Sequence, residues 1–146
     1  MRDLHNNIEV RRAISPTRIT DNTAQVSQII DLANVDAVEF VVAIGTIADA
    51  DATFTVLVED GANSSLTDNA AVADEFLLGI EGVAATPTGA SFRFDTDDAV
   101  RKIGYIGPKR YLRMTITPAL NTGNADISAV AICGKHRKGP RSSQSA

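Results

Sequence analysis

The chain has 146 residues, of which 44% are apolar and 22% charged, and its formal net charge is -4 at neutral pH. This length is enough to bury one core and short for two, so we expect a single domain. The acidic balance argues against a nucleic-acid partner, because such binding needs net positive charge. No run of 18 apolar residues and no apolar leader is present, so we expect an unexported chain without a membrane partner.

The N-terminal part predicts one strand after a short arm. Residues 1–7 hold few side chains that could build a core, whereas residues 8–14 alternate between apolar and polar types. Residues 1–13 are therefore expected to form an N-terminal arm and the first strand. Ser15-Pro16 predicts a turn, and a shorter strand is expected within residues 24–32.

The middle of the chain alternates with a period of two residues, as strands do. Residues 37–45 have a semi-apolar outer face, and their inner face holds Val38, Phe40, Val42 and Ile44. Residues 54–60 repeat the pattern, with Phe54, Val56 and Val58 on one face. Both segments predict buried strands.

Only residues 67–79 break this period. Thr67 or Asp68 could cap a short helix, alanines would fill the helix, and Gly79 would follow its end. The sequence therefore predicts one short helix here.

Strands return in the last third of the chain, with short ones expected at residues 90–95 and 99–106. In residues 126–133 both faces are fairly apolar, which suits a central strand. For residues 110–117, alternation places Leu112, Met114 and Ile116 on the core side and Tyr111, Arg113, Thr115 and Thr117 outside.

About eight strands and one short helix predict an all-β fold, either an antiparallel β-sandwich or a jelly-roll-like barrel, because half-apolar sheets bury their faces against each other. Periodicity leaves both topologies open. The β-sandwich domain is expected to cover residues 14–134. Residues 135–146 contain four basic residues and no acid, which predicts a flexible basic C-terminal tail. That tail is either an inert solubilising end or a partner contact.

Charge is divided unevenly along the chain. Between Ile19 and Phe92 there are 12 acidic residues and no Lys or Arg, whereas from Arg93 onward there are 10 basic and 4 acidic residues. Two interpretations follow. Strands of the two parts neutralise each other within one domain, or an acidic surface meets a basic surface on another copy or on a partner.

The candidate partner-binding residues come from the basic part. Exposed tyrosine beside arginine is favoured at protein interfaces, because the ring adds area with little entropy loss and guanidinium pairs well with carboxylates. The alternative is that these arginines pair across the sheet with acids of the same chain. The candidates are Lys109, Arg110, Tyr111 and Arg113, together with Lys135, Arg137 and Lys138 of the tail.

No catalytic constellation is recognisable in the sequence. The two histidines, His5 and His136, lie in the predicted arms, and Cys133 ends an apolar strand, where it is expected to be a buried small residue. The aspartates of residues 49–51 and 95–98 lack EF-hand spacing, and capping of loops explains them more simply than calcium. We therefore expect no enzymatic activity and no cofactor.

The sequence resembles a group of small proteins encoded by tailed bacteriophages and prophages, commonly near the major capsid gene. The resemblance covers roughly residues 14–140 and is carried by residues 19–32, 39–61, 70–79, 100–118 and 127–140. It implies a virion accessory protein made in the bacterial host cytoplasm. The expected role is capsid decoration or cementing of the head shell, with the major capsid protein and further copies of the chain as partners.

Two other classes stay open. A head-to-tail connector or tail component would form a ring, and its copy number would be about a dozen or fewer per particle rather than hundreds. A carbohydrate- or host-binding module would need an aromatic platform, and the chain has no Trp and only two tyrosines, Tyr105 and Tyr111. Sugar binding is therefore the weaker alternative.

Overall fold

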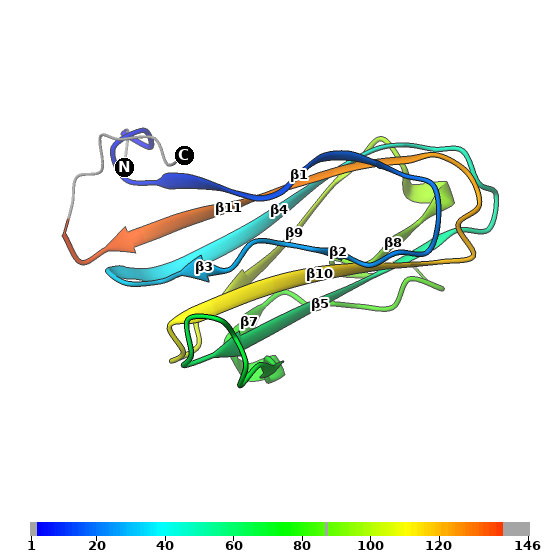
Figure 1. Ribbon diagram of the computed structural model, residues 1–146. Coiled ribbons are helices and arrows are strands. Elements are labelled where there is room, and N and C mark those ends of the chain that lie inside the picture. Colours follow the sequence, from blue (N-terminus) through cyan, green and yellow to red (C-terminus); the bar gives the residue numbers. More distant parts are fainter. Residues whose placement is uncertain (1–2, 87, 139–146) are drawn as a thin grey trace.

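The computed structural model describes residues 3–86 and 88–138 and is a sandwich of two antiparallel sheets (Figure 1). Sheet A has the strand order β1 (Glu9–Ile19), β11 (Ala125–His136), β4 (Val35–Ile47), β9 (Val100–Tyr105) and β7 (Leu77–Leu78). Sheet B has the order β2 (Gln25–Val26), β10 (Tyr111–Ala119), β5 (Thr53–Gly61) and β6 (Ala70–Ala71), with β3 (Ile30–Asp31) beside β10 and β8 (Phe92–Arg93) beside β5. The predicted all-β fold is confirmed, and it is a sandwich.

The core lies between the two sheets and is built by the alternation predicted for the long strands. Phe54 and Phe92 stack with ring centroids 4.8 Å apart and join β5 to β8. Cys133 is fully buried in β11, which is the neighbour of both β1 and β4, as expected for a central strand. The predicted inner-face residues are all at most 5% exposed: Val38, Phe40, Val42, Ile44, Phe54, Val56, Val58, Leu112, Met114 and Ile116.

β1 continues through Ser15-Pro16, so the predicted turn is wrong. Proline lacks an amide hydrogen, but β1 is an edge strand of sheet A, where a missing ladder bond can face away from the sheet. Register shifts between Arg12 and Ile14 and between Ile14 and Thr17 absorb the irregularity.

The helix predicted for residues 67–79 is replaced by a single 3-10 turn, η1 (Asp74–Phe76). Asp68, the predicted cap, instead accepts the amides of Ala62 and Asn63 at 2.8 and 3.1 Å and so closes the preceding loop. A second 3-10 turn is η2 (Phe94–Thr96). In the described part of the chain, no helix is long and apolar enough to cross a membrane.

β11 extends through His136, two residues beyond the expected end of the domain at residue 134. His136 pairs with Val35 of β4, and the amide of Arg137 donates to the carbonyl of Asn34 at 3.0 Å. The first residues of the expected tail therefore belong to sheet A, whereas residues 139–146 lie outside the described residues.

Candidate interaction surfaces

The two arginines of the basic cluster near the start of β10 are already paired within the chain. Arg110 donates from Nε and Nη2 to the two carboxylate oxygens of Asp31 at 2.8 and 2.9 Å. Arg113 donates to Glu59 at 2.7 Å, and Arg110 also lies over the ring of Tyr111, 5.1 Å from its centroid. Of the two interpretations, the alternative that these arginines pair across the sheet with acids of the acidic part is confirmed.

β4 begins and β11 finishes at the same end of the sandwich (Figure 1). A cleft of about 620 Å³ lies at this end. It is lined by residues 32–36, residues 105–110 and Arg137, and we call it the basic cleft. Three of the seven predicted contact residues, Lys109, Arg110 and Arg137, meet there although Arg137 is far from the other two in sequence.

Tyr105 fixes the wall of this cleft. Its side chain is 1% exposed, and its hydroxyl donates to Asp60 at 2.7 Å and accepts the amide of Lys109 at 3.0 Å. Burial, and then the bond to Asp60, raises the pKa of Tyr105. A Cβ at Gly107 would lie 2.5 Å from Cζ of Tyr105, so only glycine fits against the ring. The turn that carries Lys109 is therefore held in one conformation.

The remaining predicted contact residues are distributed over two places. Tyr111 and Arg113 are half-buried in β10 of sheet B and do not line the basic cleft. Lys135 and Lys138 are exposed and flank Arg137 in sequence, and Arg137 pairs with Asp36 at 2.7 Å. The seven predicted contact residues thus divide into five at or beside the basic cleft and two, Tyr111 and Arg113, on sheet B.

The opposite end of the sandwich is acidic. Four segments, residues 20–24, 48–52, 94–99 and 120–124, meet there between strand ends (Figure 1). Thr122 donates to Asp49 at 2.7 Å, and Asn121 donates to the carbonyl of Asp21 at 3.1 Å, which joins three of these segments. Together they contain no Lys or Arg and six aspartates, namely Asp21, Asp49, Asp51, Asp95, Asp97 and Asp98. We call this the acidic end.

The outer face of sheet A is rich in branched apolar side chains. Strand register places Val10 beside Ile132, Arg12 beside Val130, Val130 beside Val41, and Ala43 beside Val100. Val100 is 67% exposed and Leu78 is 51% exposed. We call the outer-face set Val10, Val41, Leu78, Val100, Val130 and Ile132 the apolar face. Three charged residues lie among them, since Arg12 pairs with Val130, Glu39 with Ile132 and Lys102 with Val41. Its five adjacent strands span about 19 Å at the usual strand spacing.

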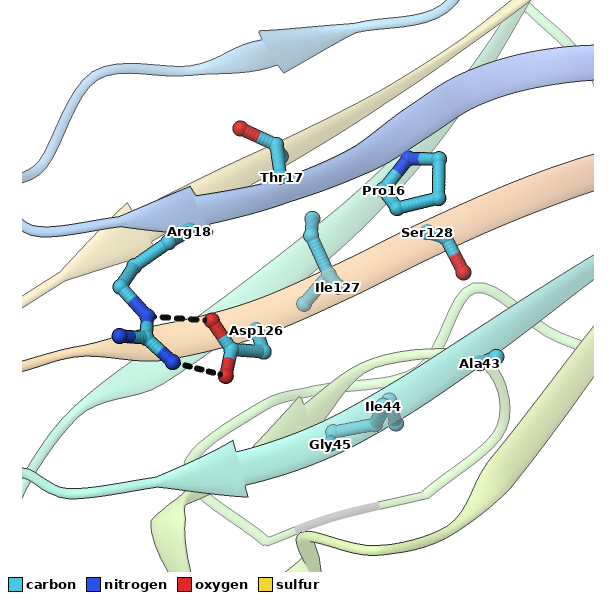
Figure 2. Close-up of a pocket in the computed structure, with 9 residues that line it drawn as sticks. All are labelled: Pro16, Thr17, Arg18, Ala43, Ile44, Gly45, Asp126, Ile127 and Ser128. Carbon is cyan, nitrogen blue, oxygen red and sulfur yellow. Dashed lines mark hydrogen bonds and ion pairs between the residues drawn. The ribbon is translucent and has the colours of Figure 1, made fainter.

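A shallow hollow of about 610 Å³ continues the apolar face over β1, β11 and β4. Small residues of β4 and β11 line it, among them Ala43, Gly45 and Ser128. Figure 2 shows Arg18 and Asp126 at one side of the hollow, joined by two hydrogen bonds of 2.8 Å each. The hollow is therefore bounded by a neutralised ion pair and is otherwise weakly charged.

The outer face of sheet B is different in kind. Its central positions on β5 and β10 pair Thr117 with Thr55, Thr115 with Leu57, and Arg113 with Glu59. Threonines and one ion pair dominate here, and the branched apolar side chains at this face are Leu57 and, from β2, Val26. The apolar character of sheet A is therefore not a general property of this sandwich.

The described residues contain neither a metal-binding group nor a histidine-based constellation. Within residues 3–86 and 88–138, no three His, Cys, Asp or Glu side chains are arranged to hold a metal ion. The aspartates considered for calcium instead serve the chain: Asp49 accepts from Thr122, Asp97 accepts the amide of Ile47, and Asp95 pairs with Arg93. Loop capping, the simpler interpretation, accounts for Asp49 and Asp97, whereas Asp95 forms an ion pair.

The apolar face was not among the candidate sites predicted from sequence. The available signal was the semi-apolar outer side of residues 37–45 and the two apolar sides of residues 126–133. Those patterns are equally typical of central strands that are buried on both faces. Only the register with β1, β9 and β7 shows that the outward side chains of β4 and β11 belong to one surface.

Comparison with known proteins supports the fold alone. No family model matches the chain, and no curated protein matches it. Among solved structures, the chain is similar to the CBM22-1 and GH10 modules of endo-1,4-beta-D-xylanase 10B from Clostridium thermocellum, complexed with xylohexaose, with a TM-score of 0.51 and 12% sequence identity. The match covers 92% of this chain and 28% of that chain, so this chain spans less than a third of that structure's length. At such low identity the likeness concerns the β-sandwich architecture.

Proposed function

We propose that this protein is a non-enzymatic structural protein of a tailed-bacteriophage particle, which decorates the outside of the head shell and cements it. The observation that carries the proposal is the apolar face, supported by the resemblance to small proteins encoded near major capsid genes. The proposed partner is the major capsid protein, and the proposed location is the surface of the virion.

Leaving the apolar face in water costs free energy. Side chains such as Val100 and Leu78 gain about 25 cal/mol for each Å² of apolar surface that a partner covers. Val10, Leu78 and Val100 are the exposed members of this face, and large exposed apolar side chains gathered on one face of a soluble protein mark an interaction site. Arg113 of β10 is less suited to this role, because it is half-buried and already pairs with Glu59.

Repetition strengthens such a contact. A shell offers many identical sites, and copies that also touch each other convert later binding steps into intramolecular ones. A weak single contact through one sheet face then gives firm retention. No active site is needed for this task.

The test is retention of purified protein on undecorated heads of the phage that encodes it. We expect Val100→Asp to weaken binding by about tenfold or more, because a tenfold loss corresponds to only about 1.4 kcal/mol and an unpaired buried charge costs more than that. The matched control is Thr117→Asp, which adds the same charge on the exposed outer face of sheet B.

Equal retention of wild type, Val100→Asp and Thr117→Asp would contradict docking through the apolar face. Failure of the wild type to bind heads at all would contradict decoration itself. A copy number of about a dozen in purified particles would instead indicate a connector.

A further inference from the structure

The two ends of the sandwich carry opposite charge. The acidic end has six aspartates and no Lys or Arg. The residues that line the basic cleft, 32–36, 105–110 and Arg137, include three Lys or Arg and one acid, Asp36, and Lys135 and Lys138 lie beside Arg137 in sequence. Three further acids lie nearby but are engaged, since Asp31 pairs with Arg110, Asp60 accepts a hydrogen bond from the hydroxyl of Tyr105, and Asp68 accepts hydrogen bonds from two loop amides.

We propose that the basic cleft of one copy binds the acidic end of a second copy, so that copies join head to tail. This contact goes beyond the proposed function and does not depend on it, because it uses other surfaces than the apolar face. The partner is identified by charge complementarity, which steers and orients protein association.

The basic cleft has hydrogen-bond donors that its internal pairs do not use. Lys109 is exposed, and its backbone amide is fixed by the buried hydroxyl of Tyr105. Arg110 uses Nε and Nη2 for Asp31, which leaves the N–H groups of Nη1 and one on Nη2. A carboxylate that enters the cleft can therefore bind an ammonium and guanidinium donors without breaking the existing pairs.

The acidic end has carboxylates that lack a cation. Asp95 pairs with Arg93, and Asp97 caps the amide of Ile47, but Asp51 and Asp98 are exposed and pair with no Lys or Arg within the described residues. The carboxyl group of the neighbouring Asp49 raises the pKa of Asp51. A cation from a second copy would relieve this repulsion, so the contact is favourable on both sides.

The position of the two surfaces decides the type of assembly. They lie at opposite ends of strands such as β4 (Figure 1), and a 13-residue strand spans about 40 Å at 3.3 Å per residue. A contact between unlike surfaces leaves one free surface on each side of a pair, so it is heterologous and adds further copies. Because exposed charges drive it, salt should weaken it, as the screening length falls from about 10 Å at 0.1 M to about 3 Å at 1 M.

The experiment is sedimentation velocity of the purified full chain over a range of concentrations at low and high salt. We expect concentration-dependent association at low salt and monomers at high salt. Lys109→Glu, and separately the double variant Asp51→Lys with Asp98→Asn, should each weaken association by about fivefold or more. The control is Lys102→Glu, which makes the same charge change on sheet A and should leave association unchanged.

Mixing the two defective variants is the sharpest arm of this test. Lys109→Glu keeps an intact acidic end, and the double variant keeps an intact basic cleft, so an equimolar mixture should form pairs that do not grow. Circular dichroism and thermal unfolding confirm that each variant folds. The proposal is overturned if the wild type stays monomeric at low salt, if Lys102→Glu weakens association as much as Lys109→Glu, or if the mixture forms no pairs. Each of these results leaves the retention of protein on heads as a separate measurement.

Discussion

At the scale of single residues, the contact between Tyr105 and Asp60 ties the two sheets together inside the core. Tyr105 belongs to β9 of sheet A, and Asp60, 9% exposed, belongs to β5 of sheet B. The same hydroxyl accepts the amide of Lys109, so one oxygen satisfies a carboxylate and a backbone group. Sequence alone leaves Tyr105 as a possible exposed ring, because its position at the end of a short predicted strand does not fix its burial.

Replacing Tyr105 with Phe removes the donor to Asp60 and the acceptor for Lys109 while keeping the ring. We expect the free energy of unfolding to fall by about 1–3 kcal/mol, the usual cost of leaving a buried polar group unsatisfied. Urea unfolding measures this change. The matched control is Tyr111→Phe, half-buried on sheet B, which should stay within about 0.5 kcal/mol of wild type. Equal effects of the two variants would contradict the role given to Tyr105.

At the scale of elements, the ion pair between Arg110 and Asp31 fastens β3 to the start of β10. The hydrogen bond from Arg110 is the main cause that lowers the pKa of Asp31 below its usual value. A carboxylate whose pKa is lower in the folded state stabilises the fold above its unfolded pKa, and this contribution is lost as pH falls through the folded pKa. The contribution is therefore present at neutral pH and absent in strong acid.

The variant Arg110→Gln tests this linkage. We expect it to be less stable than wild type at pH 6 and the difference to shrink as the pH falls from about 4 towards about 2, because Asp31 then becomes protonated in both proteins. Thermal unfolding at several pH values measures the difference. Arg12→Gln is the control, since Arg12 donates to the hydroxyl of Ser15 and to the side-chain oxygen of Gln28, which are both uncharged. A difference for Arg110→Gln that stays constant with pH would contradict the assignment.

Strand prediction from the sequence succeeds where alternation is long and fails where pairing is brief. β4, β5, β10 and β11 have nine or more residues each, and their inner faces follow from periodicity. β6 and β7 have two residues each and exist because β5 and β9 offer them partners. Residues 67–79, for which the sequence predicts a helix, instead contain β6 and β7, which pair with β5 and β9. Tertiary pairing therefore overrides local propensity in this segment.

At the scale of the whole molecule, the surface has four distinct parts: an apolar face on sheet A, a threonine-rich face on sheet B, a basic cleft and an acidic end. The segregation of charge along the chain is compatible both with internal neutralisation and with opposed surfaces. The structure pairs Arg110, Arg113 and Arg137 internally, while Lys109 at one end and Asp51 at the other are exposed. The basic residues of the cleft could be predicted from sequence. The apolar face could not, because it depends on the register of five strands.

Cryo-electron microscopy of the intact phage particle tests the proposed decoration of the shell most directly. The account predicts density for the sandwich on the outside of the head, repeated over the shell, with Val100 and Leu78 of sheet A turned towards the major capsid protein. Density confined to the portal or tail, absence of the protein from the particle, or a copy on the shell with its apolar face turned to solvent would contradict it.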